Sequence, residues 1–238
     1  MNTSFEEKYT KAFQQVYQQQ GDILLQQIDS NSWDAVQANI TINDSGLQSL
    51  LNDLYQEAVS HAAAKTQRSL IQYNTKNEPD ERQYEQYATE LFAAIGMRHV
   101  FAMLDHSRSL VQRMMRNARK RFDSVPERID YFTRLWKEST VYRAQTASET
   151  ELLISTEFGS DLGAQAFQLS TNQIVMKQWD ATSDMHTRSS HATANGQWQR
   201  LQDQFEVGGY KARYPGDVFL PLKEKVRCRC FAKYTVEK

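Results

Sequence analysis

Glycine is spread very unevenly along this chain of 238 residues. The first 158 residues contain three glycines, whereas the last 80 contain the other six. Glycine weakens helices and supplies the positive φ angles that tight turns between short strands require. The sequence therefore predicts long helices up to about residue 173, followed by a turn-rich region that carries short strands.

Apolar residues in the first region recur at the spacing of an α-helix. They fall three or four positions apart, which places them on one helix face that packs against other helices. The stretches with this pattern are 5–17, 47–59, 84–95, 100–122 and 129–136. Asp44 or Ser45 suits the N-cap of the second stretch, and Pro126 suits the first turn of the last one.

Strand and turn signals dominate after residue 173. Residues 174–179 alternate between two faces with the period of a β-strand. Turn signals follow at 195–196, 208–209 and 214–217. The run 226–234 alternates again, so it predicts a strand that carries Cys228 and Cys230 on one face.

The fold class predicted from these patterns is α+β. Residues 1–150 are expected to form an extended helical region, and residues 151–238 a small α+β module with short antiparallel strands. The net charge of −1 favours no class of charged partner. No apolar run approaches the roughly 18 residues that cross a bilayer, so no membrane partner is expected. Two cysteines exclude a disulfide-scaffolded secreted domain.

A series of landmarks follows in a fixed order after residue 155. In chain order these are Thr156, Glu157, Trp179, Asp184, Arg188, His191, an Asn-Gly turn at 195–196, Phe205, Tyr214-Pro215-Gly216-Asp217, and Cys228 with Cys230. Each piece is common by itself, but the ordered set is specific. In this order and spacing, residues 150–235 resemble the phage Mu F-like minor head protein family, also called the phage head morphogenesis domain.

The resemblance implies a structural protein of a phage head and no catalytic reaction. It implies a minor capsid protein near the portal vertex, which acts in head assembly, DNA packaging or DNA release. The expected partners are the portal protein, the major capsid protein or both, with non-specific contact to packaged DNA, and the expected location is the virion, assembled in the host cytoplasm. Family members often carry a fused toxin or peptidase module, and no such activity is expected of a chain that stops at Lys238.

The charged motif residues predict a polar network. If residues 184–191 are helical, Asp184, Arg188 and His191 line one face. A buried arginine needs a carboxylate partner, which Glu157 or Asp184 would supply to Arg188. This network would fix the helical segment 184–191 to the small sheet.

The thiols and imidazoles leave three readings open. His186, His191, Cys228 and Cys230 are ligand types that zinc prefers, but the one-residue spacer between the cysteines is unlike common zinc modules. Two reduced, buried thiols are therefore preferred to a structural zinc site, and no cofactor is expected. An enzyme would use His191 with Asp184 as an acid–base pair and a cysteine as nucleophile, but no companion catalytic motif is present.

Basic residues concentrate on one predicted helix. From Arg98 to Lys137 there are ten lysines and arginines against four acidic residues. Arg108, Arg116, Arg119 and Lys120 form a stripe beside its apolar face, which would meet phosphates or an acidic protein surface unless it is simply solvated. An alternative function is therefore a nucleic-acid-binding accessory protein outside the shell.

Overall fold

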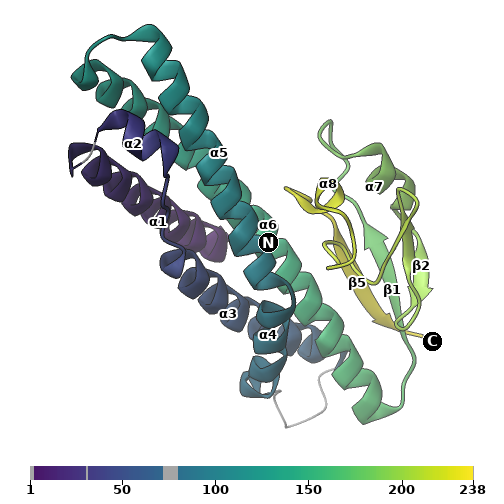
Figure 1. The fold of residues 1–238 in the computed structure, drawn as a ribbon. Helices are drawn as coiled ribbons and strands as arrows, with labels where there is room; N and C mark the ends of the chain where they lie inside the picture. The colour runs from purple at the N-terminus through teal and green to yellow at the C-terminus, as the bar shows by residue number, and fades with distance from the viewer. Residues whose placement is uncertain (1–2, 31, 72–79, 238) are drawn as a thin grey trace. The chain divides into compact units, whose positions relative to one another are not determined.

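The computed structural model describes residues 3–30, 32–71 and 80–237 (Figure 1). The first part is helical, and the predicted α+β class is confirmed. Its helices are α1 (Thr3–Ser30), α2 (Trp33–Ala38), α3 (Ser45–Leu70), the 3-10 turn η1 (Glu81–Tyr84), α4 (Glu85–Leu91), the π-helix η2 (Phe92–Gly96), α5 (Met97–Arg121) and α6 (Val125–Thr171). The described helices are all too short or too polar to cross a bilayer.

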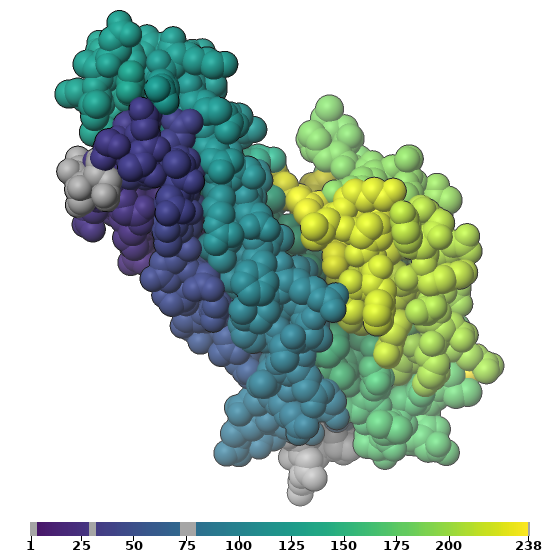
Figure 2. All heavy atoms as spheres, viewed as in Figure 1, coloured from purple at the N-terminus to yellow at the C-terminus, as the bar shows by residue number. Residues whose placement is uncertain are grey.

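The C-terminal part contains short strands and two short helices. In chain order these are β1 (Val175–Asp180), α7 (Ser189–Ala194), β2 (Trp198–Arg200), β3 (Phe205–Val207), β4 (Tyr210–Ala212), α8 (Leu222–Lys225) and β5 (Phe231–Val236). The strands form an antiparallel sheet in the order β2-β1-β5 and a separate β3-β4 hairpin. Central strand β1 buries Val175, Lys177 and Trp179, so the predicted alternation is confirmed. Figure 2 shows the residues after about 200 closely packed against one another on the visible face.

Described residues of the chain form two compact units. One combines the residues up to Leu51 with 94–148, and the other combines 52–93 with 149–238. The predicted boundary at 150/151 lies close to the second division. The described residues 52–71 and 80–93 pack with the C-terminal residues, an association that no local pattern in the sequence indicates.

The core of the first unit depends on one close approach. A Cβ atom added to Gly21 would overlap the indole ring of Trp136. The Trp136 Nε1 atom donates a hydrogen bond of 2.9 Å to the Tyr17 carbonyl oxygen. Phe13 and Tyr17 are buried, as the predicted apolar stripe of 5–17 requires.

In the second unit, α3 and α6 approach through glycine. Cβ atoms added to Gly159 and Gly163 would overlap the carbonyl oxygens of Val59 and Ala63. Both glycines lie inside α6. Two of the six glycines in the last 80 residues therefore serve helix packing and do not form turns. The remaining late glycines do form turns, with positive φ angles at Gly196, Gly208, Gly209 and Gly216.

Two local predictions differ from the structure. Residues 184–191 are not one helix, because α7 begins at Ser189 and Arg188 is its N-cap. Strand β5 begins only at Phe231, since the chain at Arg227 takes a φ of 53° and turns before the cysteines. Cys228 and Cys230 still share the buried side of their segment, because Arg229 between them is exposed.

Candidate functional site

The centre of the C-terminal module is a buried cluster of rings. The Trp179 ring packs edge-on against His191 at 5.6 Å and against Phe205 at 5.5 Å between ring centroids. These three residues come from β1, α7 and β3, and all are buried. The structure thus brings together three motif residues that lie far apart in the sequence.

His191 joins the two cysteines to a buried carboxylate. Its Nδ1 atom lies 3.2 Å from the Cys230 sulfur and 3.4 Å from the Cys228 sulfur. Its Nε2 atom lies 3.1 Å from a Glu224 carboxylate oxygen, which also accepts a hydrogen bond of 2.9 Å from the Ser190 hydroxyl. The cysteines are free thiols.

Burial and the thiol contact set opposite pKa shifts for the two cysteines. A hydrogen bond from the Cys228 thiol lowers the pKa of Cys230, against the effect of burial. The same hydrogen bond and burial raise the pKa of Cys228.

Glu224 belongs to this buried cluster, although the sequence patterns do not indicate it. It lies in the four-residue helix α8, between Lys223 and Lys225. Three consecutive charged residues are typical of a solvated helix face, but only 7% of the Glu224 surface is exposed. Its role appears only when α8 packs beside α7.

His186 does not belong to this cluster. Among the described residues, the group with metal-ligating atoms within 4.8 Å of one another consists of His191, Cys228 and Cys230. His186 is exposed, and its backbone N–H donates to Asp184 at 2.9 Å. The four-residue zinc set considered from the sequence is therefore reduced to three.

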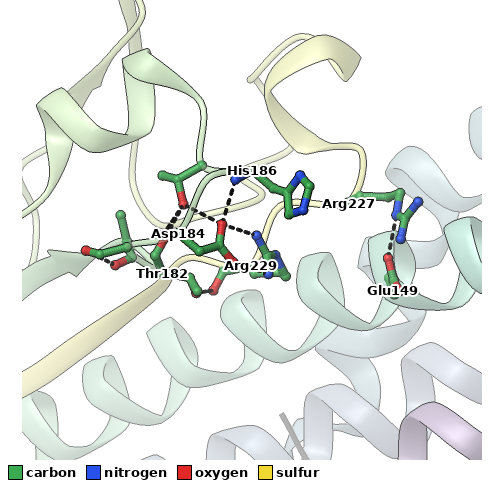
Figure 3. A network of polar contacts seen from close by, with 9 residues as sticks. Glu149, Thr182, Asp184, His186, Arg227 and Arg229 are labelled. Carbon is green, nitrogen blue, oxygen red and sulfur yellow. Dashed lines mark hydrogen bonds and ion pairs between the residues drawn. The ribbon is translucent and has the colours of Figure 1, made fainter.

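The polar network has different partners from those predicted. Asp184 pairs with Arg229 at 2.6 Å, as Figure 3 shows, and this hydrogen bond lowers the pKa of Asp184 to about 2. Arg188 donates instead to the Val226 carbonyl oxygen. The expectation that Asp184 or Glu157 neutralises Arg188 is wrong. The helix α7 begins only at Ser189, so Asp184 is not on one helix face with Arg188, and Glu157 accepts the Ala232 N–H instead.

These contacts fix the segment that carries the cysteines. Arg227 pairs with Glu149 at 2.8 Å, as Figure 3 shows. The backbone N–H of Arg227 donates to the Thr150 hydroxyl at 3.1 Å, and the Thr182 hydroxyl donates to the Arg229 carbonyl at 2.8 Å. Both sides of Cys228 are thus held to neighbouring elements, which positions the thiols against His191.

Removing the Arg188 side chain tests this arrangement. Arg188→Ala deletes the hydrogen bond to the Val226 carbonyl, which we expect to lower the free energy of unfolding by about 1–2 kcal/mol. Arg188→Lys is the control, since it keeps the charge and a donor. Chemical denaturation measures both variants, and equal stability of Arg188→Ala and the wild type would contradict the expected contact.

Thr156 and Glu157 lie in the C-terminal half of α6, and Glu157 joins this helix to β5. A Glu157 carboxyl oxygen accepts the Ala232 backbone N–H at 2.9 Å, which ties α6 to β5. Burial raises the pKa of Glu157 to about 8, although this hydrogen bond acts the other way. The Thr156 hydroxyl donates to the Leu152 carbonyl oxygen at 2.6 Å, a bond within the helix.

The Tyr214-Pro215-Gly216-Asp217 motif is a tight turn. Asp217 N–H donates to the Tyr214 carbonyl at 3.1 Å, and Gly216 has a φ of 79°, so residues 214–217 form a type II turn. The Asp217 carboxylate accepts the N–H groups of Arg213 at 2.6 Å and Phe219 at 3.0 Å. The turn packs closely on α6, because a Cβ atom added to Gly216 would lie 3.2 Å from the Leu153 side chain.

The basic stripe on α5 is exposed and partly neutralised. Arg108 pairs with Asp105 at 2.9 Å, and Arg119 pairs with Asp34 at 2.8 Å. Within the described residues, no ion pair is recorded for Arg116 or Lys120. These two side chains are therefore the charges of the stripe that remain for a partner.

Comparisons with known proteins identify one partial relative. The NAD(+)--arginine ADP-ribosyltransferase EFV of Enterococcus faecalis is 31% identical to this chain over 87 residues. The match covers 37% of this chain and only 17% of that protein's length. No protein-family model matches the chain, and no solved structure matches it.

Proposed function

We propose that this protein is a minor capsid protein of a phage or prophage, which acts near the portal vertex in head assembly, DNA packaging or DNA release. The proposal rests on the resemblance of residues 150–235 to the Mu F-like minor head protein family. Its partners are then the portal protein, the major capsid protein or both, and its location is the virion.

The observation that carries the proposal is the burial of the motif residues in one core. Trp179, His191, Phe205, Cys228 and Cys230 contact one another and are between 0 and 3% exposed. Side chains that a substrate must reach lie at a surface or in a cleft. This buried part of the motif favours an architectural role over a reaction centre.

The partial relative fits the same proposal. A match that covers little of a longer protein is expected when two proteins share one module and differ in the rest. The resemblance implies fusion of such modules to toxins, and the name of the relative describes an ADP-ribosyltransferase. Here the shared module is proposed to be the head morphogenesis part.

Deletion and complementation in the encoding phage or prophage test the function. We expect the deletion to reduce the yield of infectious particles, the wild-type gene to restore it, and mass spectrometry to detect the protein in purified virions. Unchanged yield together with absence from virions would refute the proposal. Incubation of the purified protein with NAD⁺ and an arginine substrate is the parallel assay, and ADP-ribosyl transfer would favour the enzyme instead.

Charge reversal tests the exposed part of the basic stripe. Arg116→Glu combined with Lys120→Glu is expected to weaken association with the portal or capsid protein about tenfold or more, without changing the circular dichroism spectrum. Lys8→Glu with Lys11→Glu is the control, because it makes the same charge change on exposed positions of α1. Equal binding by both double variants would show that the stripe is only solvated. Salt-sensitive binding to DNA without affinity for portal protein would favour the accessory-protein alternative.

A further inference from the structure

We propose that His191, Cys228 and Cys230 form a binding site for one zinc-class metal ion. The ligands are the Nδ1 atom of His191 and the two cysteine sulfurs, and the fourth tetrahedral position belongs to a water molecule or another small ligand. The site goes beyond the capsid function and stands independently of it. It also revises the preference for reduced thiols that the spacing of the cysteines favours.

The distances fit a tetrahedral ion. With zinc–sulfur bonds of about 2.3 Å and a zinc–nitrogen bond of about 2.05 Å, tetrahedral angles separate nitrogen from sulfur by about 3.6 Å. The two nitrogen–sulfur distances here are 3.2 and 3.4 Å, and all three atoms lie within 4.8 Å of one another. The two nitrogen–sulfur distances therefore need to lengthen by only a few tenths of an ångström to enclose an ion.

The chain turns at Arg227, which removes the objection raised by the one-residue spacer. On a regular strand, two cysteines separated by one residue hold their sulfurs too far apart for one ion. Here the segment before β5 is irregular, and the Cys230 N–H donates to the Cys228 sulfur at 3.4 Å. This local bend gathers both sulfurs on the same side of His191.

Glu224 sets the imidazole in the form that a metal needs. A carboxylate oxygen only accepts hydrogen bonds, so its contact with Nε2 places the ring proton there and leaves the Nδ1 lone pair facing the sulfurs. Ser190 holds the carboxylate in turn. Metal-ligating histidines commonly donate their second N–H to a carboxylate in this way. Glu224 is thus a positioning residue for the site.

Charge balance also favours an ion in this core. Two thiolates and a divalent cation sum to zero, whereas a bare thiolate in an apolar core carries a large desolvation cost. The surrounding cluster includes Leu153, Trp179 and Phe205, all buried. An ion would join α7 to the segment before β5, in a module with few strands of its own.

These atoms could also be interpreted as a thiol–imidazole–carboxylate catalytic group, but the structure supports this interpretation less well than a metal site. Both sulfurs and the imidazole are 2–3% exposed, and the Trp179 ring covers His191 edge-on. A nucleophile needs a path for its substrate, and the burial of these side chains does not provide one.

Metal analysis of the purified protein tests the site. We expect protein that has been dialysed in metal-free buffer to retain about one equivalent of zinc. Inductively coupled plasma mass spectrometry measures this content. Replacement with Co²⁺ should give the visible absorption of tetrahedral cobalt and a sulfur-to-cobalt charge-transfer band. Zinc well below one equivalent, together with a Co²⁺-loaded sample that lacks this band, would overturn the proposal.

Matched variants assign the ligands. Cys228→Ser and Cys230→Ser should each lose the charge-transfer intensity of a sulfur ligand and bind zinc at least tenfold more weakly, whereas His186→Asn should bind one equivalent as the wild type does. Glu224→Gln should keep the stoichiometry and weaken affinity by about 10–100-fold. Where a cysteine variant does not fold, titration of the wild type with a chelator decides: a lower melting temperature on metal removal supports the site, and an unchanged one contradicts it.

Discussion

Gly163→Ala is expected to destabilise the protein, although alanine is the better helix former. In an open helix the change would stabilise by about 1 kcal/mol. In α6, however, the new methyl group would overlap the Ala63 carbonyl oxygen and lie 2.8 Å from its carbonyl carbon. Backbone atoms of α3 cannot rotate away as a side chain can, so the two helices must separate. We expect a net loss of about 2–3 kcal/mol, the usual cost of overpacking.

Gly46→Ala is the matched control for this prediction. It makes the same chemical change in a helix, but the nearest atom to the new methyl group would be a Val16 methyl at 3.4 Å. Its stability should stay within about 0.5 kcal/mol of the wild type or rise. Thermal unfolding distinguishes the two, since Gly163→Ala should melt at least about 5 °C lower. Similar melting temperatures would mean that α3 and α6 do not approach through Gly163.

Local signals in the sequence predicted much of this fold. The positive φ angles at Gly196, Gly208, Gly209 and Gly216 lie at turns, and the predicted apolar stripes lie on helices. Turn chemistry and helical periodicity depend on neighbours in the chain, so they can be recognised from the sequence alone. The boundary of the helical region near residue 173 was predicted for the same reason, since α6 ends at Thr171.

Features that depend on distant contacts could not be predicted. Gly159 and Gly163 look like turn residues until the approach of α3 is known. Lys177 is fully buried on the inner face of β1, where its ammonium donates to the Leu201 carbonyl at 2.8 Å. The sequence places it on that face but gives no reason to expect a buried charge there, because its partner comes from another part of the chain.

In the candidate site, too, some features could be predicted from the sequence and others could not. Spacing predicted a helix face joining Asp184, Arg188 and His191. However, Asp184 accepts the His186 N–H in a local turn, so α7 begins only at Ser189. The ligand types that zinc prefers grouped His186, His191, Cys228 and Cys230, and the structure brings the last three together. Glu224 could not be predicted as part of the site, since nothing in a Lys-Glu-Lys run distinguishes a buried carboxylate from a solvated one.

Glu157 is expected to make the protein less stable as the pH rises. Burial raises the pKa of its carboxyl group to about 8, above the ordinary value of 4.5, and charge on Cys230 and Asp161 acts in the same direction. Between these two pH values the folded protein holds a proton that the unfolded chain releases, so stability falls with rising pH across this window. Above about pH 8 the folded state must bury the charge, and the full loss is reached.

Glu157→Gln removes this titration while keeping an oxygen that accepts the Ala232 N–H. The difference in unfolding free energy between wild type and Glu157→Gln should therefore shift in favour of the variant as the pH rises from about 4.5 to 8, by on the order of 4 kcal/mol. Urea denaturation at a series of pH values measures this shift.

Asp184→Asn is the control for the pH dependence, because it makes the same carboxyl-to-amide change in the same unit. The hydrogen bond from Arg229 lowers the pKa of Asp184 to about 2, so its contribution to stability is lost only as the pH falls below about 4. Its difference from the wild type should stay constant between pH 5 and 9, where the difference for Glu157→Gln changes most. A Glu157→Gln difference that is equally constant over this range would show that Glu157 is ionised in the folded protein and that its burial is not as the structure places it.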